Sequence, residues 1–136
     1  MPLSGMAAHR CTVMPQSVLR LDTRRVSISI QVRSERHDVV AGIDDVAGSL
    51  PDAPVPLTAA DLPDDRLHYP MLAYVDPLGD TCFNRLQTTA VLQELHQLAH
   101  EAAPGDRRAE SRARAVEVLV AAHMRKPHTY LWFIGN

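Results

Sequence analysis

The stretch that decides the fold is Tyr69 to Gln87, YPMLAYVDPLGDTCFNRLQ. Its first part, Met71 to Val75, is an unbroken apolar and aromatic run between Pro70 and Asp76. Such a run predicts a short strand that is buried on both faces. A buried helical segment would have the same periodicity, but five residues bounded in this way are too few for a regular helix.

A tight turn and the start of a helix are predicted next. Asp76 to Gly79, with Asp first, Pro second and Gly fourth, predicts a type I turn, because Pro presets φ and the Asp side chain can bond the backbone beyond it. Asp80 or Thr81 could cap a first helical turn. Asn84, followed three residues later by Gln87, is a second candidate cap that is close to a capping box.

The first half of the chain predicts strands. Val26 to Arg33 alternates between apolar and polar residues, so its even-numbered side chains, Val26, Ile28, Ile30 and Val32, share one face. Val39 to Ile43 predicts another short strand. Ser17 to Leu21 is a weaker apolar run, and the residues from Asp22 to Arg25 could join it to the main strand as a hairpin.

Residues 44–70 are expected to be irregular, because five of the ten prolines fall there and proline removes backbone donors. Thr58 to Asp61 could form one helical turn. A connection of this length is usually functional or mobile. The alternative, which we prefer, is an acidic segment that wraps the surface.

Two helices and a last strand are predicted in the second half. Asn84 to Ala102 has an apolar face at helical spacing, and Pro104 to Asp106 separates it from a second helix at Arg107 to Met124. His128 to Ile134 is rich in aromatic and β-branched residues and predicts a strand. The chain is therefore expected to be an α+β domain, a small, mostly antiparallel sheet with two helices packed on one face. Met71 to Val75 should share that sheet with the last strand.

Length and composition favour a single domain over residues 17–136, preceded by a weakly ordered extension at 1–16. The formal net charge of −2 gives no general attraction for nucleic acid or anionic membranes. No apolar run reaches the roughly 20 residues needed to span a bilayer. Cys11 and Cys82 make no disulfide framework, so reduced thiols in the cytoplasm are expected.

Two segments carry a resemblance. Asp76 to Gln87, DPLGDTCFNRLQ, and His128 to Asn136, HTYLWFIGN, resemble a group of small uncharacterised bacterial proteins. That group shares a D-P-x-G-D-T-x-F-N-R-L-Q segment and a Y-L-x-F-I-G-D-like tail. Here the last residue is Asn136 and not Asp. The resemblance implies kinship and a place to look for a site, but no activity.

The predicted turn is the main candidate site. Two carboxylates, Asp76 and Asp80, near a helix start could bind a divalent ion, or one could act as a base while helix amides hold an anion. The alternative is that the polar residues only cap a turn and a helix. The nucleophile loop of haloacid-dehalogenase-like phosphatases is excluded, because it needs Asp-x-Asp-Gly-Thr spacing. The candidate binding residues are Asp76, Gly79, Asp80, Thr81, Asn84 and Arg85.

Other candidate residues are weaker. His96 and His100 have the i, i+4 spacing of a helical metal pair, but no third ligand is evident and both are expected to face solvent. His123 lies on the apolar stripe of its helix, which favours a hydrogen-bonded core histidine over a catalytic one. Cys82 is expected near a helix start, which would lower its pKa, and His123 or His128 could serve as its base.

The sequence contains no phosphate-binding loop, no G-x-S-x-G, no C-x-x-C and no H-E-x-x-H, which favours a binding protein without a cofactor over an enzyme. We expect an immunity-like or regulatory module that binds another protein, and the sequence does not determine its oligomeric state. The first alternative is a small metal-dependent hydrolase with its site between Asp76 and Arg85. The second is nucleic-acid binding through the arginines of the first third, Arg20, Arg24, Arg25 and Arg33.

Overall fold

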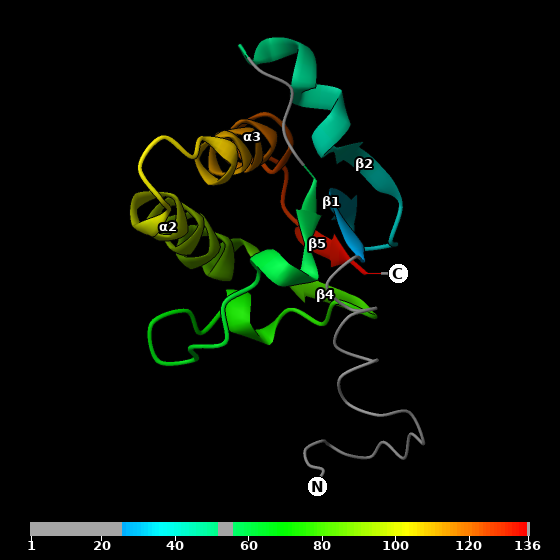
Figure 1. The fold of residues 1–136 in the computed structure, drawn as a ribbon. Coiled ribbons are helices and arrows are strands. Elements are labelled where there is room, and N and C mark those ends of the chain that lie inside the picture. The colour runs from blue at the N-terminus through cyan, green and yellow to red at the C-terminus, as the bar shows by residue number, and fades with distance from the viewer. Residues whose placement is uncertain (1–25, 52–55, 136) are drawn as a thin grey trace, which may run out of the picture.

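The structure, a computed structural model, describes residues 26–51 and 56–135. A mostly antiparallel sheet runs through the centre of the molecule in the order β2-β1-β5-β4, and the short β3 pairs with the beginning of β1 (Figure 1). The strands are β1 Ser27–Ser34, β2 Val39–Gly42, β3 Leu57–Thr58, β4 Asp80–Phe83 and β5 Thr129–Ile134. The predictions of strands at 26–33, 39–43 and 128–134 are therefore confirmed.

The alternation in β1 determines which face of the sheet is buried. Ile28, Ile30 and Val32 are buried, whereas the residues between them are more exposed. Ile30 lies opposite Phe133 and Val32 opposite Leu131, so β1 and β5 contribute to the same apolar layer. The strand expected at 17–21 and its hairpin turn lie outside the described residues. Within the described part, β1 pairs with β5 on one side and with β2 and β3 on the other.

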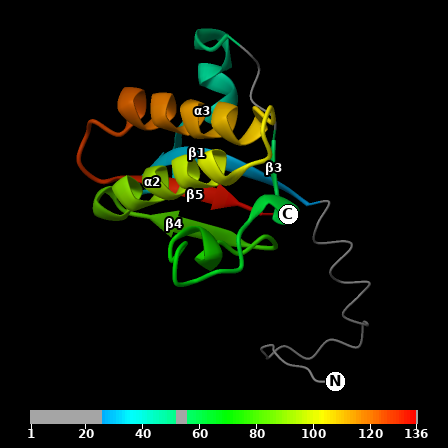
Figure 2. The same ribbon diagram turned by 60° about the vertical axis from the view of Figure 1, so that its left-hand side comes forward.

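Two helices, α2 Arg85–Glu101 and α3 Arg108–His123, pack against each other and cover one face of the sheet (Figures 1 and 2). Both lie within a residue of their predicted bounds. α3 contacts β1 and β2, while α2 contacts β5 and β4. The layer between helices and sheet holds the core, in which Phe83 and Phe133 meet edge to face at 5.7 Å. The predicted α+β architecture is confirmed.

The prediction of a strand at Met71 to Val75 is wrong. This segment forms a 3-10 helix, η3 Leu72–Tyr74, in which the amides of Tyr74 and Val75 bond carbonyls three residues back. The amide of Leu72 donates instead to the buried carboxylate of Glu94 on α2 (2.9 Å), and the amide of Met71 reaches the same carboxylate. These amides are therefore unavailable to a neighbouring strand, and the predicted pairing of this segment with the last strand does not occur.

β4 takes the place of that predicted strand. Asp80 and Thr81 do not cap a helix, because they begin the strand that pairs with β5. Thr81 and Phe83 are buried and Asp80 and Cys82 are exposed, which is the alternation of a strand with one face on the core. The helix cap is Asn84, the second of the two predicted candidates.

Short helical segments occupy the proline-rich connection. η1 spans Ile43–Ser49, and η2, Ala59–Asp61, confirms the helical turn predicted at Thr58 to Asp61. Residues 52–55 are outside the described part. Among the helices of residues 26–51 and 56–135, none is long and apolar enough to cross a membrane.

Candidate functional site

The predicted turn forms, and its polar groups largely stabilise it. The Gly79 amide donates to the Asp76 carbonyl (3.3 Å), and the Leu78 amide donates to the Asp76 carboxylate (2.9 Å). The amide of Asp76 donates to the hydroxyl of buried Thr81 (2.9 Å). One oxygen of Asp76 and the hydroxyl of Thr81 are thus already bonded within the turn.

The end of the chain closes on this turn. The amide of Gly135 donates to the carbonyl of Gly79 (2.7 Å), which extends the pairing of β4 with β5. A Cβ on Gly135 would lie 2.5 Å from the carbonyl carbon of Pro77 and closer still to its oxygen. Glycine is therefore required for this close approach. The two segments that carry the resemblance are adjacent in space, so the turn, β4, β5 and Gly135 form one structural unit.

Asn84 and Arg85 mark the start of α2. Asn84 accepts from the Gln87 amide (2.8 Å), and Gln87 accepts from the Asn84 amide (3.0 Å), so the predicted capping box is complete. Arg85 and Asp80 are exposed, and neither side chain makes a hydrogen bond or ion pair with the residues that the structure describes. The charged groups of Asp80 and Arg85 therefore remain accessible to a ligand, and exposed Asp76 has one carboxylate oxygen without a hydrogen bond from the described residues.

The predicted metal-binding residues do not assemble into a cluster. Within residues 26–51 and 56–135, no three His, Cys, Asp or Glu side chains lie close enough together to hold a metal ion. His96 is exposed, as expected, and its Nε2 is 3.6 Å from a carboxylate oxygen of Glu117 on α3. His100 is also exposed. Of this pair, His96 contacts the neighbouring helix, and the described part of the chain supplies no third ligand for the two histidines.

Cys82 lies near a helix start, as expected, but two residues before the N-cap Asn84 and therefore outside the first turn of α2. It lies in β4 opposite Trp132 of β5, and burial raises the pKa of its thiol. A raised pKa reduces the thiolate fraction, so this position disfavours a nucleophile. His128 lies beside Glu35, with 3.6 Å between Nδ1 and the carboxylate, and His123 is half-buried at the end of α3.

A surface that the sequence analysis did not single out lies on the sheet, on the side opposite the helices. Cross-strand pairing places its side chains in three rows over β2, β1, β5 and β4. We call this surface the outer face. Its members are Val39 with Arg33 and Tyr130, then Gln31 with Trp132 and Cys82, and last Ser29 with Ile134 and Asp80.

Trp132 is at the centre of the outer face. The Arg33 guanidinium lies 5.1 Å from the centroid of its ring, and the His37 ring meets it edge to face at 5.2 Å. Arg33 is held in place by a hydrogen bond from its Nε to the Gln31 side chain (2.9 Å). The indole Nε1 of Trp132 is buried without a hydrogen-bond partner among the described residues. The Trp132 ring is half-buried, and its contacts with Arg33 and His37 hold it in one orientation.

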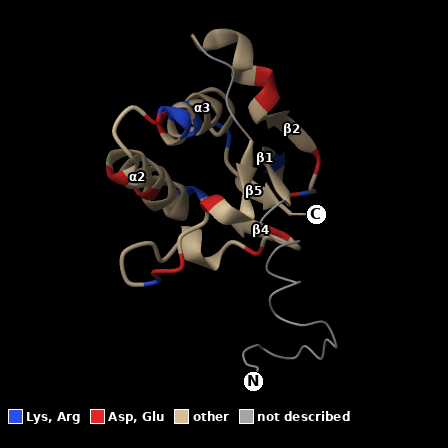
Figure 3. Cartoon of the chain, in the orientation of Figure 1, with Lys and Arg blue, Asp and Glu red and all other residues tan. Residues whose placement is uncertain are grey.

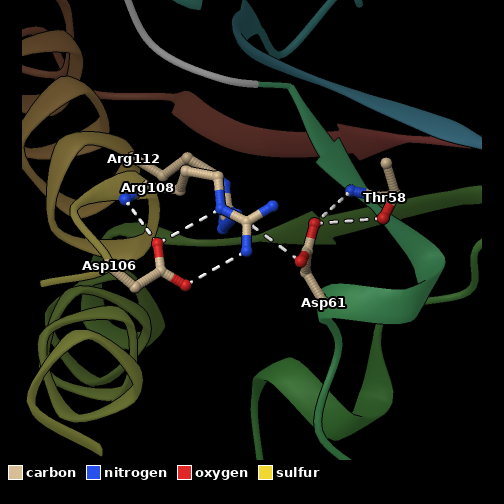
Figure 4. Close-up of polar contacts among 5 residues, drawn as sticks. All are labelled: Thr58, Asp61, Asp106, Arg108 and Arg112. Atoms are coloured by element: carbon tan, nitrogen blue, oxygen red, sulfur yellow. Dashed lines mark hydrogen bonds and ion pairs between the residues drawn. The ribbon is translucent and has the colours of Figure 1, made fainter. Parts of the chain in front are cut away.

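A second group of polar side chains joins the start of α3 to η2 (Figure 4). Asp61 accepts from the amide and hydroxyl of Thr58 and lies 3.5 Å from the guanidinium of buried Arg112. Asp106 accepts from the backbone and guanidinium of Arg108, and these bonds lower the pKa of Asp106 to about 2. These charges are paired with each other, so the group attaches the connection to the helix.

No protein-family model, curated protein or solved structure matches this chain. Its function therefore has to be inferred from the chemistry of its surfaces. The outer face and the accessible part of the turn meet at Asp80, which belongs to both.

Proposed function

We propose that this chain is a protein-binding module, immunity-like or regulatory, without catalytic activity of its own, and that its contact surface is the outer face. The observation that carries the proposal is the central cluster of Trp132, Tyr130 and Arg33 on a sheet surface that none of the described helices covers. Tryptophan, tyrosine and arginine are the residue types that dominate binding energy at protein interfaces. We also propose a cytoplasmic location, which the free thiol of Cys82 supports.

The organisation of the outer face fits a protein partner. On β5, Tyr130, Trp132 and Ile134 form an aromatic and aliphatic stripe. Charged or polar side chains lie on both sides of this stripe, with Arg33, Gln31 and Ser29 on β1 and Asp80 on β4. Interfaces between proteins have this arrangement, with an apolar centre inside a polar rim. Trp132 is already oriented by Arg33 and His37, so little side-chain freedom is lost on binding.

Val39 offers a direct test because it is 55% exposed on the outer face. Wild-type protein, Val39→Asp and the control Leu67→Asp should be used as bait in extracts of the native host. Leu67 is 84% exposed on a loop away from the sheet, so its substitution matches the chemistry at another place. We expect a protein that wild type and Leu67→Asp retain and Val39→Asp loses, and the purified pair should bind at least about tenfold more weakly with Val39→Asp.

The opposite result would be retention of the same proteins by all three baits, or loss with both substitutions. Either outcome would contradict the proposal that the outer face is the contact surface. A further bait, Leu86→Asp, changes the most exposed apolar side chain at the start of α2, next to Arg85. Loss of the partner with Leu86→Asp alone would place the contact at the predicted turn instead.

Single-stranded nucleic acid is a second candidate for the same face. Tyr130 and Trp132 lie on β5, a central strand of an antiparallel sheet, beside Arg33, and bases can stack on such side chains. Of the four arginines in this hypothesis, only Arg33 is among the described residues. Fluorescence anisotropy with a labelled single-stranded oligonucleotide at low and high salt tests it. Salt-sensitive binding that Arg33→Ala weakens would support this alternative, and no binding at low salt would exclude it.

A further inference from the structure

A cavity of about 350 Å³ lies on the helical side of the molecule, away from the outer face. It is bounded by α3, by His96 of α2 and by Leu50 at the end of η1. Its size is at the lower end of the range for small-molecule sites, which is about 300–1,000 Å³. The wall supplied by α3 consists of Arg107, Glu110, Ser111 and Arg114.

The spacing on α3 gives the cavity its polar side. Arg107, Ser111 and Arg114 are separated by four and three residues, so they form one stripe along the helix. The side chains of Arg107 and Arg114 make no ion pair or hydrogen bond with any residue in the described part of the chain. The neighbouring arginines differ, because Arg108 pairs with Asp106 and Arg112 with Asp61.

Charge in the cavity wall favours an anion. Two arginines against Glu110 leave an excess of one positive charge before His96 is counted. The wall is the first half of α3, where the Asp106 carboxylate already accepts a hydrogen bond from the Arg108 amide, so the excess positive charge comes from the arginine side chains and not from the helix terminus. Figure 3 shows basic residues gathered at this beginning of α3. Arginine is well suited to phosphate, because its planar donors match two oxygens at once.

We propose that this cavity binds a phosphate monoester of a small organic molecule. Arg107 and Arg114 donate to the phosphate oxygens, the hydroxyl of Ser111 donates between them, and the organic part lies against Leu50. The cavity is larger than a phosphate ion alone requires, and Leu50 gives it an apolar wall. This site is independent of the protein-binding surface on the opposite side of the sheet.

The experiment is a titration of the full chain with inorganic phosphate and with phenyl phosphate, at constant ionic strength, by calorimetry and by NMR shifts of α3 amides. We expect saturable binding of both, tighter for phenyl phosphate because its ring contacts the apolar wall. Arg107→Gln and Arg114→Gln should each weaken binding by about fivefold or more. Arg125→Gln is the matched control, since Arg125 is an exposed arginine just beyond the other end of α3.

The exposure of Arg107 and Arg114 means that the variants should fold, and melting temperatures equal to that of wild type verify this. Non-saturable binding, or Arg107→Gln and Arg114→Gln variants that bind as wild type does, would overturn the proposal. Equal weakening by Arg125→Gln would also overturn it, because the attraction would then be general to the helix. Equal affinity for the two probes would exclude the apolar part of the site.

Discussion

Gly135 shows how one residue can hold the end of a chain in place. Its amide bonds the carbonyl of Gly79, and its missing Cβ leaves room for the Pro77 carbonyl. Gly135→Ala should therefore move the tail away from the turn and lower the free energy of unfolding by about 2 kcal/mol. Urea denaturation followed by circular dichroism measures this loss.

The control for that substitution is Gly48→Ala, because a Cβ on Gly48 meets nothing within 4 Å. That variant should be neutral or slightly more stable than wild type, since alanine reduces the freedom of the unfolded chain. Equal stability of the two variants would show that the tail does not depend on the close approach.

The environment of the Tyr69 hydroxyl leads us to expect a specific dependence of stability on pH. This hydroxyl donates to the Glu101 carboxylate, and burial together with this bond raises the pKa of Tyr69 to about 12, above the usual value of about 10. A raised pKa means that folding favours the protonated phenol. The contribution of the hydroxyl is therefore complete below pH 10 and is lost as the pH rises through 12.

The test compares Tyr69→Phe with wild type from pH 7 to pH 12. Below pH 10 the variant should be less stable by about 1 kcal/mol, and the difference should shrink as the pH approaches 12. Tyr74→Phe, at a tyrosine that is 73% exposed, should show no such difference. If the stability difference between Tyr69→Phe and wild type stayed constant up to pH 12, the raised pKa of Tyr69 would be contradicted.

At the level of elements, η3 depends on α2. The buried carboxylate of Glu94 accepts hydrogen bonds from the amides of Met71 and Leu72, which would otherwise lack partners. Glu94→Ala should destabilise the protein by about 2–3 kcal/mol, because buried donors without partners are costly. It should also speed hydrogen exchange at the Leu72 amide.

Gln93→Ala is the matched change on the exposed side of the same helix, and its effect should stay within about 0.5 kcal/mol. If Glu94→Ala and Gln93→Ala were equally stable, or if Leu72 remained protected in both, the attachment of η3 by Glu94 would be incorrect.

For the molecule as a whole, the described residues form one continuous apolar core. Its buried residues run from Ile28 to Phe133 and connect all the longer elements. We predict that a chain beginning at Gln16 melts within a few degrees of the full chain by differential scanning calorimetry. A much larger loss would show that residues 1–15 contact the core or a second subunit.

Much of the fold was predictable from local pattern. The alternation in β1, the helical spacing in α2 and α3 and the capping box at Asn84 each depend on residues close together in sequence. Those patterns were enough to predict an α+β domain with two helices on one face of an antiparallel sheet. The turn at Asp76 to Gly79 also formed as its residue types require.

Tertiary contacts decided the rest. Met71 to Val75 is apolar enough for a strand. Its first two amides, however, donate hydrogen bonds to the carboxylate of Glu94, more than twenty residues away, and the segment forms a helical turn. The outer face could not be recognised either, because both sides of β5 are apolar and only pairing with β1 and β4 shows which side is open. Sequence periodicity by itself determined β1, α2, α3 and β5, because the residues of each pattern are neighbours in the chain. The helical turn η3, the strand β4 and the open side of β5, and therefore the candidate binding surface, depended on which distant segments pack together.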